Sequence, residues 1–107
     1  MILEIAEIDV KAGHEPDFES AVGRALPLFR AAPGCRGVQL QRGVEQPNRY
    51  FLVVRWETLE DHTVGFRGSE AFTRWRALVS PHFEAPPRVQ HARPVLGGKS
   101  FICPAST

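Results

Sequence analysis

The segment YFLVV, which begins at Tyr50, is apolar at five consecutive positions. A strand that covers one side of a small domain alternates apolar and polar residues, because only one of its faces meets the core. Here Tyr50, Leu52 and Val54 point to one face. Phe51 and Val53 point to the other. We therefore expect a strand that is covered on both of its faces.

The first ten residues, MILEIAEIDV, predict another strand of the same kind. Ile8 and Val10 lie on one of its faces, and Leu3 and Ile5 lie on the other. A turn around Gly13 follows this strand.

A helix is expected to begin near Glu15, with Pro16 in its first turn, where the missing N–H costs little. Apolar residues then recur at three- and four-residue steps, which is the period of an amphipathic helix. They are Phe18, Ala21, Val22, Ala25, Leu26 and Phe29. Pro27 lies inside this pattern and is predicted to kink or end the helix, with residues 28–32 forming a looser turn.

Residues 37–44 and 48–56 are predicted to pair as a β-hairpin. Val38 and Leu40 alternate with glutamines in the first of these strands. The tetrapeptide EQPN at 45–48 has the residues that a turn prefers.

A second helical region follows the hairpin and is divided in two by Gly65 and Gly68. Thr58 can cap its first part, because Asp61 lies three residues later in a near capping box. Ser69 is the expected cap of the longer second part. The apolar face of that part consists of Phe72, Trp75, Leu78 and Val79.

The order of these elements predicts the fold class. Residues 84–95 form a last strand, with prolines at its start and end as an edge position permits. The order βαββαβ is that of a ferredoxin-like α+β fold, in which a four-stranded antiparallel sheet carries helices on one face. No further segment is large enough to cover the other face, so we expect a homodimer in which two sheets meet.

A chain of 107 residues suits a single domain. We expect residues 1–95 to form this domain and residues 96–107 to form a C-terminal tail. Gly97 and Gly98 are the expected hinge of the tail. The apolar triplet FIC at 101–103 is predicted to dock on the body or on the partner subunit.

Composition and charge argue against nucleic-acid and membrane partners. The chain is 43% hydrophobic and 23% charged, with a net charge of +1, whereas phosphate binding needs a basic face. No run approaches the roughly 18 apolar residues of a membrane span. Glu4 and Glu7 interrupt the N-terminal apolar run, which also lacks a basic opening, so we expect no signal peptide and a cytoplasmic location. Cys35 and Cys103 are predicted to be free thiols.

Three stretches of the chain resemble the antibiotic biosynthesis monooxygenase (ABM) superfamily of dimeric α+β barrels. They are PGC at 33–35, NRYFLVVRWETLEDH at 48–62 and FRGSEAFTRW at 66–75. In that family a similar turn precedes the hairpin, a Trp closes the third strand, and helices with similar His, Phe and Trp spacing follow. The superfamily includes cofactor-independent monooxygenases, quinol oxidases, haem-degrading enzymes and signal-processing enzymes. The resemblance therefore implies the shared fold and does not single out one activity.

The haem-degrading branch uses an Asn on the first strand, a Trp in the first part of the second helical region, and a His near the end of its second part as the iron ligand. The corresponding positions here hold Ala6, Phe66 and Arg76. An arginine offers no lone pair to iron. The comparison therefore argues against haem degradation.

Family members that oxidise aromatic substrates without metal or flavin let the substrate anion react directly with oxygen. The protein supplies an apolar pocket, a group that takes the proton, and donors that hold the anion. The resemblance thus implies a small cofactor-independent monooxygenase acting on an aromatic, quinol-like substrate of polyketide type. The alternative is a barrel that binds a small apolar molecule without turning it over, since an apolar pocket serves both functions.

Two histidines are candidates for the catalytic base. His62 stands one turn before Phe66, and imidazole titrates near neutral pH. The alternative for His62 is a partly exposed helical residue bonded to Glu57 or Asp61. His82 is the second candidate, although it can also end the helix, where a cation suits the last carbonyls.

The resemblance also implies aromatic and basic substrate contacts. These candidates are Trp56, Phe66, Phe72, Trp75, Arg74 and Arg76. The alternative for the aromatic residues is an ordinary core. The alternative for the arginines is a solvated helical face, because Arg67, Arg74 and Arg76 are interspersed with acidic residues.

The remaining motifs predict no metal or nucleotide site. His14 and His91 are expected at a turn and on an edge-strand surface, and no HxH or HxxxH pair is present. GGKS at 97–100 resembles the end of a phosphate-binding loop, but the first glycine of that motif would fall on Arg93.

Overall fold

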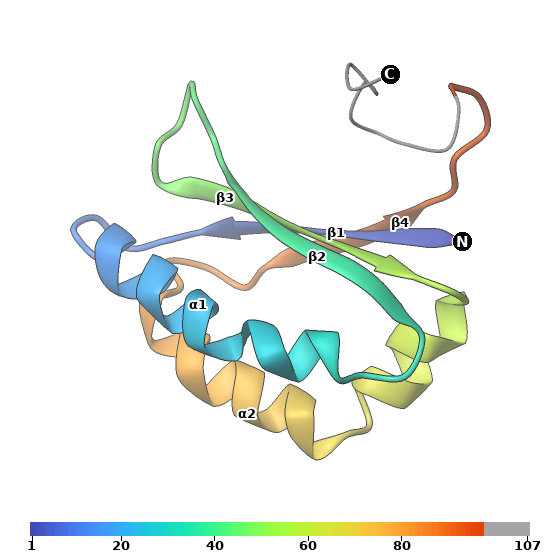
Figure 1. Ribbon diagram of the computed structural model, residues 1–107. Helices are drawn as coiled ribbons and strands as arrows, with labels where there is room; N and C mark the ends of the chain where they lie inside the picture. The colour runs from blue at the N-terminus through green and yellow to red at the C-terminus, as the bar shows by residue number, and fades with distance from the viewer. Residues whose placement is uncertain (98–107) are drawn as a thin grey trace.

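The computed structural model describes residues 1–97 (Figure 1). Its elements follow the predicted order, with a short helical turn before and after the second long helix. They are β1 (Ile2–Asp9), α1 (Glu15–Arg30), β2 (Cys35–Arg42), β3 (Arg49–Trp56), η1 (Asp61–Phe66), α2 (Glu70–Val79), η2 (Ser80–His82) and β4 (Arg88–Ala92). The predicted docking of residues 101–103 lies outside the described residues.

The four strands form one antiparallel sheet in the order β2-β3-β1-β4. The central pair β1 and β3 runs from Ile2 opposite Trp56 to Asp9 opposite Arg49. Strand β4 pairs with the other side of β1 and is an edge strand, as predicted. This arrangement confirms the ferredoxin-like α+β fold.

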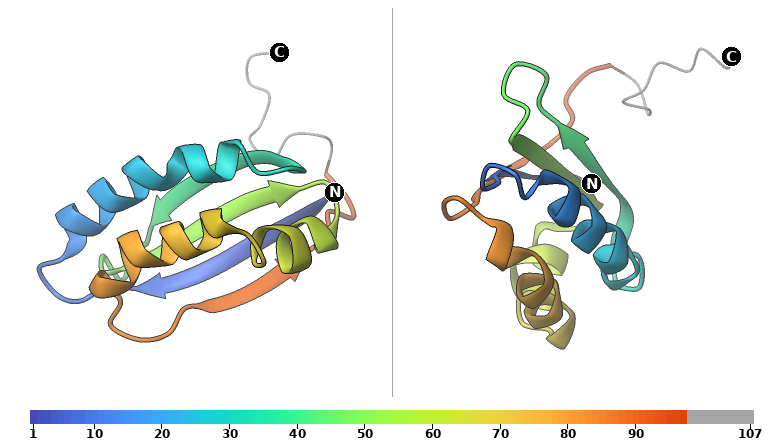
Figure 2. Two further views of the ribbon diagram at one scale, coloured as in Figure 1. Left: turned by 90° about the horizontal axis from the view of Figure 1, so that it is seen from below. Right: turned by 90° about the vertical axis from the view of Figure 1, so that its left-hand side faces the viewer.

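Both long helices cover the same face of the sheet (Figures 1 and 2). Tyr50, Leu52 and Val54 point toward these helices and are fully buried. Phe51 and Val53 lie on the opposite face and are only half-buried. The strand is therefore apolar on both faces, and within the described residues only one face is covered, so cover of the outer face stays a prediction.

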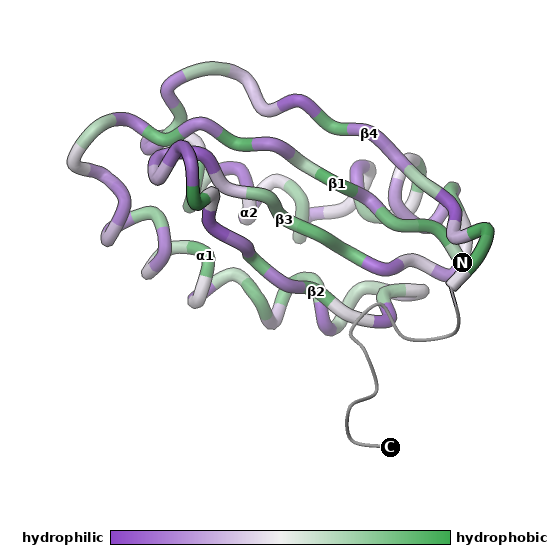
Figure 3. Tube along the Cα trace, turned by 90° about the horizontal axis from the view of Figure 1, so that it is seen from above, coloured by the Kyte–Doolittle hydropathy of each residue, from purple (hydrophilic) through white to green (hydrophobic). Residues whose placement is uncertain are grey.

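The outer face of the sheet carries an apolar centre on β1 and β3 (Figure 3). Leu3 and Ile5 from β1 lie there beside Phe51 and Val53 from β3, with Ile5 directly opposite Val53. All four side chains are half-buried.

Pro27 does not end α1, and the predicted looser turn at 28–32 is wrong, because the helix continues to Arg30. Pro27 and Gly23, the residue four positions earlier, both lie on the exposed side of the helix. The Gly23 carbonyl that loses its partner can therefore bond to water. Phe29 is buried in the core beyond the proline and holds the last turn in place.

The last strand is shorter than the predicted 84–95. Strand β4 contains only Arg88–Ala92. Pro86 and Pro87 precede it and Pro94 follows it, and a proline has no N–H to donate to the ladder.

The first part of the second helical region was expected to be a short helix, and the structure shows a π-helix, η1. Its wide turn is seen in the bond from the Arg67 N–H to the His62 carbonyl, five residues earlier. The predicted capping box is present, since the Thr58 N–H donates to Asp61 Oδ2 at 3.0 Å and the Asp61 N–H donates to Thr58 Oγ1 at 3.1 Å. Ser69 caps α2, as predicted.

Within residues 1–97, none of the helices combines the length and the apolar character needed to cross a lipid bilayer.

Gly34 packs closely against the Asp61 side chain at the start of η1. We expect Gly34→Ala to destabilise the protein by about 2–4 kcal/mol. Gly34 has a φ of +84°, and an added Cβ would collide with the Asp61 side chain that forms the capping box. Gly13→Ala is the matched control, because Gly13 has a φ of +86° but no atom near the new Cβ. The control should cost only about 1–2 kcal/mol. Urea unfolding of both variants measures the difference, and equal costs would contradict the role of the Asp61 contact.

Candidate functional site

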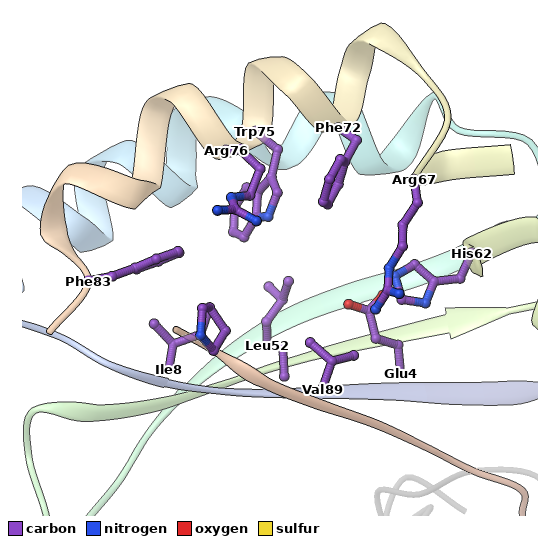
Figure 4. A pocket seen from close by; sticks show the side chains of 12 residues that line it. Glu4, Ile8, Leu52, His62, Arg67, Phe72, Trp75, Arg76, Phe83 and Val89 are labelled. Atoms are coloured by element: carbon purple, nitrogen blue, oxygen red, sulfur yellow. The ribbon is translucent and has the colours of Figure 1, made fainter. Parts of the chain in front are cut away.

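A cavity of about 320 Å³ lies between the sheet and the second helical region (Figure 4). Its volume is at the lower end of the range for small-molecule sites, roughly 300–1,000 Å³. Ala6 lies at its floor, between Leu52 on β3 and Val89 on β4. The small side chain of Ala6 leaves room beneath α2, so the sheet contributes a shallow apolar floor.

The helical side of the cavity combines aromatic and charged side chains. They are His62, Arg67, Phe72, Trp75, Arg76 and Phe83. Arg67 and Arg76 are both exposed, so they mark the solvent side of the cavity.

Glu4 is a buried carboxylate at one end of the cavity. Strand alternation places it on the helix-covered face, and only 5% of its surface is exposed. Its Oε1 accepts a hydrogen bond from Trp56 Nε1 at 2.9 Å. Burial raises the pKa of Glu4, while the Trp56 hydrogen bond and the positive charge of Arg67 oppose this increase.

His62 lies beside Glu4 and is 2% exposed. Its Nε2 is 3.3 Å from Glu4 Oε1, and its Nδ1 is 2.8 Å from His91 Nε2. The ring stacks on Trp56 with centroids 5.5 Å apart. Burial, followed by the charges of Arg67 and His91, lowers the pKa of His62 to about 4. His62 is therefore neutral at pH 7.

The alternative that His62 is a partly exposed residue bonded to Glu57 or Asp61 is wrong. The prediction that His91 lies on the surface is also wrong, because its ring is half-buried against His62. Burial, followed by the charge of Arg67, lowers the pKa of His91.

The polar contacts around Glu4 assign the ring protons of both histidines. An ionised Glu4 carries no proton, so its 3.3 Å contact favours a ring proton on His62 Nε2. The Nδ1 atom of His62 then accepts a hydrogen bond from the Nε2–H of His91. Glu4, His62 and His91 thus form one row of polar contacts, with Trp56 as the hydrogen-bond donor to the carboxylate.

The cavity contains only some of the predicted substrate contacts. Phe72, Trp75 and Arg76 line it, with the Arg76 guanidinium 5.9 Å from the centre of the Phe72 ring. Trp56 and Phe66 do not line it but pack behind His62.

The other two predicted residues lie away from the cavity lining. Arg74 is exposed on α2. His82 contacts His14, with their Nδ1 atoms 3.1 Å apart. Neither residue contacts the Glu4 carboxylate or the His62 ring.

The sequence analysis overlooked Glu4 and Arg67. Glu4 was noted only as an interruption of an apolar run, yet its even position places it in phase with the inward-facing Ile2, Ala6 and Ile8. This position in the alternation was the sequence signal that Glu4 faces the core. Arg67 was assigned to a solvated face, whereas it borders the cavity together with Arg76.

The arrangement suits a small aromatic anion. Apolar walls take up its rings, and the two exposed arginines can pair with its negative charge. Glu4 is the one carboxylate in the described lining. Among residues 1–97, no group of three or more His, Cys, Asp or Glu side chains could hold a metal ion.

Comparisons with known proteins agree with this fold. Bacillus subtilis YczJ, an uncharacterized protein, is 39% identical over 95 residues, covering 89% of this chain and all of YczJ. A mycobilin-producing heme oxygenase of Mycobacterium tuberculosis is 32% identical over 103 residues, covering 94% of this chain and 84% of that protein.

Solved structures show the same likeness. A Bordetella bronchiseptica protein proposed to be an antibiotic biosynthesis monooxygenase is 53% identical, with a TM-score of 0.87 over 89% of this chain and 97% of that one. A Nitrosomonas europaea protein with the same proposed activity has a TM-score of 0.78 at 18% identity, covering 90% of this chain and all of that one, and so shows the fold alone. The family model described as "Antibiotic biosynthesis monooxygenase" matches residues 1–78. The chain therefore belongs to the antibiotic biosynthesis monooxygenase (ABM) family.

Proposed function

We propose that the protein is a small monooxygenase that oxidises an aromatic, hydroxylated, quinol-like substrate without a bound cofactor. The observation that supports this proposal is an apolar cavity in which a buried Glu4–His62 pair and two exposed arginines converge. Such a site can bind the substrate, accept its hydroxyl proton and stabilise the resulting anion.

The proposed reaction uses dioxygen as the oxidant and the substrate as the electron donor. Loss of the hydroxyl proton leaves an electron-rich ring that reacts with dioxygen. One oxygen atom replaces the ring hydrogen and becomes a carbonyl oxygen, while the substrate hydroxyl becomes a second carbonyl. The other oxygen atom leaves as water with that ring hydrogen and the hydroxyl proton. The protein positions the ring against Phe72 and Trp75 and holds the oxyanion near Arg76.

The heme oxygenase relative raises the question of whether this cavity suits haem. His62 is the one histidine in the described lining, and both of its ring nitrogens already have partners. Arg76 offers no lone pair to iron. The described residues therefore do not fit haem ligation, and no step of the proposal uses it.

We also propose that the protein works as a homodimer. The apolar centre of the outer sheet face supports this assembly, because a second copy of the same face can cover it. A cytoplasmic location and a single domain at residues 1–95 remain predictions from the sequence.

Oxygen uptake by the purified protein with hydroxylated polycyclic quinols tests the proposed function. We expect uptake that saturates with quinol and needs no added metal or flavin. Tight binding of these quinols without oxygen uptake would instead support the binding-protein alternative.

Arg76→Gln is expected to weaken binding of an ionised aromatic substrate by roughly 2- to 5-fold, because an exposed cation contributes up to about 1 kcal/mol. Arg74→Gln is the matched control, since Arg74 lies on the same helix outside the cavity lining. Quenching of tryptophan fluorescence measures both affinities. Equal weakening by the two substitutions would indicate a general charge effect and contradict the assignment of Arg76.

A further inference from the structure

We infer that Glu4 is the catalytic residue that takes the hydroxyl proton of the substrate, and that His62 and His91 are positioning residues that hold its carboxylate. This inference rests on the proposed function and names the group that carries out its first step. It replaces His62, the candidate from the sequence, with the acidic residue beside it.

Both ring nitrogens of His62 already face polar groups of the protein. Its Nε2 lies 3.3 Å from Glu4 Oε1, and its Nδ1 shares a hydrogen bond of 2.8 Å with His91 Nε2. A proton from the substrate could be accepted by His62 only if the substrate displaced one of these groups. The ring is also 2% exposed and stacked on Trp56, so it has little freedom to turn toward the cavity.

Glu4 has the free oxygen that His62 lacks. The contacts of the carboxylate with Trp56 and His62 both fall on Oε1. Within the described residues, Oε2 has no hydrogen-bond partner and is not among the fully buried unpaired atoms. Figure 4 shows the carboxylate at the end of the cavity, beside Arg67. Oε2 is therefore the atom placed to receive a proton from a bound hydroxyl.

The contacts of Oε1 explain how the carboxylate stays oriented. Trp56 donates to Oε1, and His62 Nε2 lies 3.3 Å from the same oxygen. His91 donates to His62 from the adjacent strand, where it pairs with Glu4. These contacts favour the ionised form of Glu4 and leave Oε2 free. In the proposed step the O–H bond breaks, its electron pair remains on the substrate oxygen, and the proton moves to Oε2. The proton then leaves Oε2 for the solvent when the product departs.

The burial of Glu4 and His62 favours the carboxylate over the imidazole as the group that holds the proton. Burial raises the pKa of Glu4 and lowers the pKa of His62 to about 4, so their ordinary order is reversed. A proton that enters the pair therefore rests on the carboxyl group. The titratable and charged groups around Glu4 are His62 and Arg67 after β3, His91 on β4, Cys35 on β2 and Arg76 on α2.

A hydroxyanthraquinone tests the inference without oxygen chemistry, because its neutral and anionic forms absorb at different wavelengths. In wild-type protein the bound dye should become anionic without releasing a proton to a weakly buffered solution, since Glu4 keeps the proton. Glu4→Gln, which is nearly the same shape, should bind the dye within about 3-fold but leave it neutral, or ionise it only with proton release. Circular dichroism confirms that the variant is folded.

The positioning role of His91 is tested by the pH dependence of dye ionisation. His91→Ala removes the hydrogen-bond donor to His62 Nδ1, so the His62 ring beside Glu4 is less firmly held and Glu4 should become harder to ionise. The acid limb of the curve of dye ionisation against pH should therefore move to higher pH. His14→Ala is the matched control, because it removes the other His–His contact of the described chain, far from Glu4. The control should leave the acid limb unchanged.

The outcomes separate the inference from the proposed function. Dye ionisation that persists in Glu4→Gln but disappears in His62→Gln would assign the base to His62 and overturn the inference. Dye ionisation by wild-type protein without oxygen uptake from any quinol would overturn only the proposed function. A cavity that binds no phenol of this kind would overturn both.

Discussion

His62→Ala should consume oxygen roughly 10²-fold more slowly than the wild-type protein with a hydroxylated polycyclic quinol, the usual scale of acid–base catalysis. The substitution removes the ring nitrogen that lies 3.3 Å from Glu4 Oε1 and the ring that stacks on Trp56. The carboxylate then loses the contact that orients it toward the cavity. Oxygen-electrode measurements at saturating quinol give the change in kcat.

His82→Ala is the control for this experiment, because His82 contacts His14 and does not line the cavity. Its uptake should remain within about 2-fold of wild type. Uptake that survives in His62→Ala would point instead to stabilisation of an already ionised substrate by Arg67 or Arg76. In that case the rate would follow the ionisation of the substrate rather than that of any group in the cavity.

Val53→Asp is expected to abolish the homodimer or make the protein aggregate. Val53 lies at the apolar centre of the outer sheet face, opposite Ile5 on β1 and Gln39 on β2. A carboxylate buried in a sheet-to-sheet interface without a partner costs several kcal/mol. Sedimentation velocity at micromolar concentration distinguishes dimer, monomer and aggregate.

Val44→Asp is the matched control, because Val44 is 86% exposed in the hairpin turn. This variant should sediment as the wild-type protein does. A stable monomeric wild-type protein, or a Val53→Asp variant that dimerises normally, would contradict the proposed assembly.

Much of the fold was predictable from the sequence because its signals are local. Alternation in β1 and β3 identified which side chains face the helices, and the recurrence of Phe18 to Phe29 identified α1. The Thr58–Asp61 capping box and the Ser69 cap were likewise visible as short motifs. Pro27 was misjudged because its effect depends on exposure, which the sequence pattern alone does not report.

The candidate site was predictable only in part. Phe72, Trp75 and Arg76 share the cavity, as expected, because helical periodicity places them on one side of α2. His62 was identified, but its partners were not. The π-helical turn of η1 changes the direction of its side chains relative to a regular helix, and no motif in the sequence signals that turn.

The sequence by itself determined most of the secondary structure, the ferredoxin-like order and the two apolar faces of the sheet, because each depends on periodicities within one element. Only the tertiary structure joined Glu4, His62 and His91. The β1–β4 register places Glu4 opposite His91, and η1 brings His62 between their side chains. Contacts between residues so far apart in the chain depend on strand register and helix placement. These follow from the packing of the whole core, so no local pattern could reveal which titratable side chains meet.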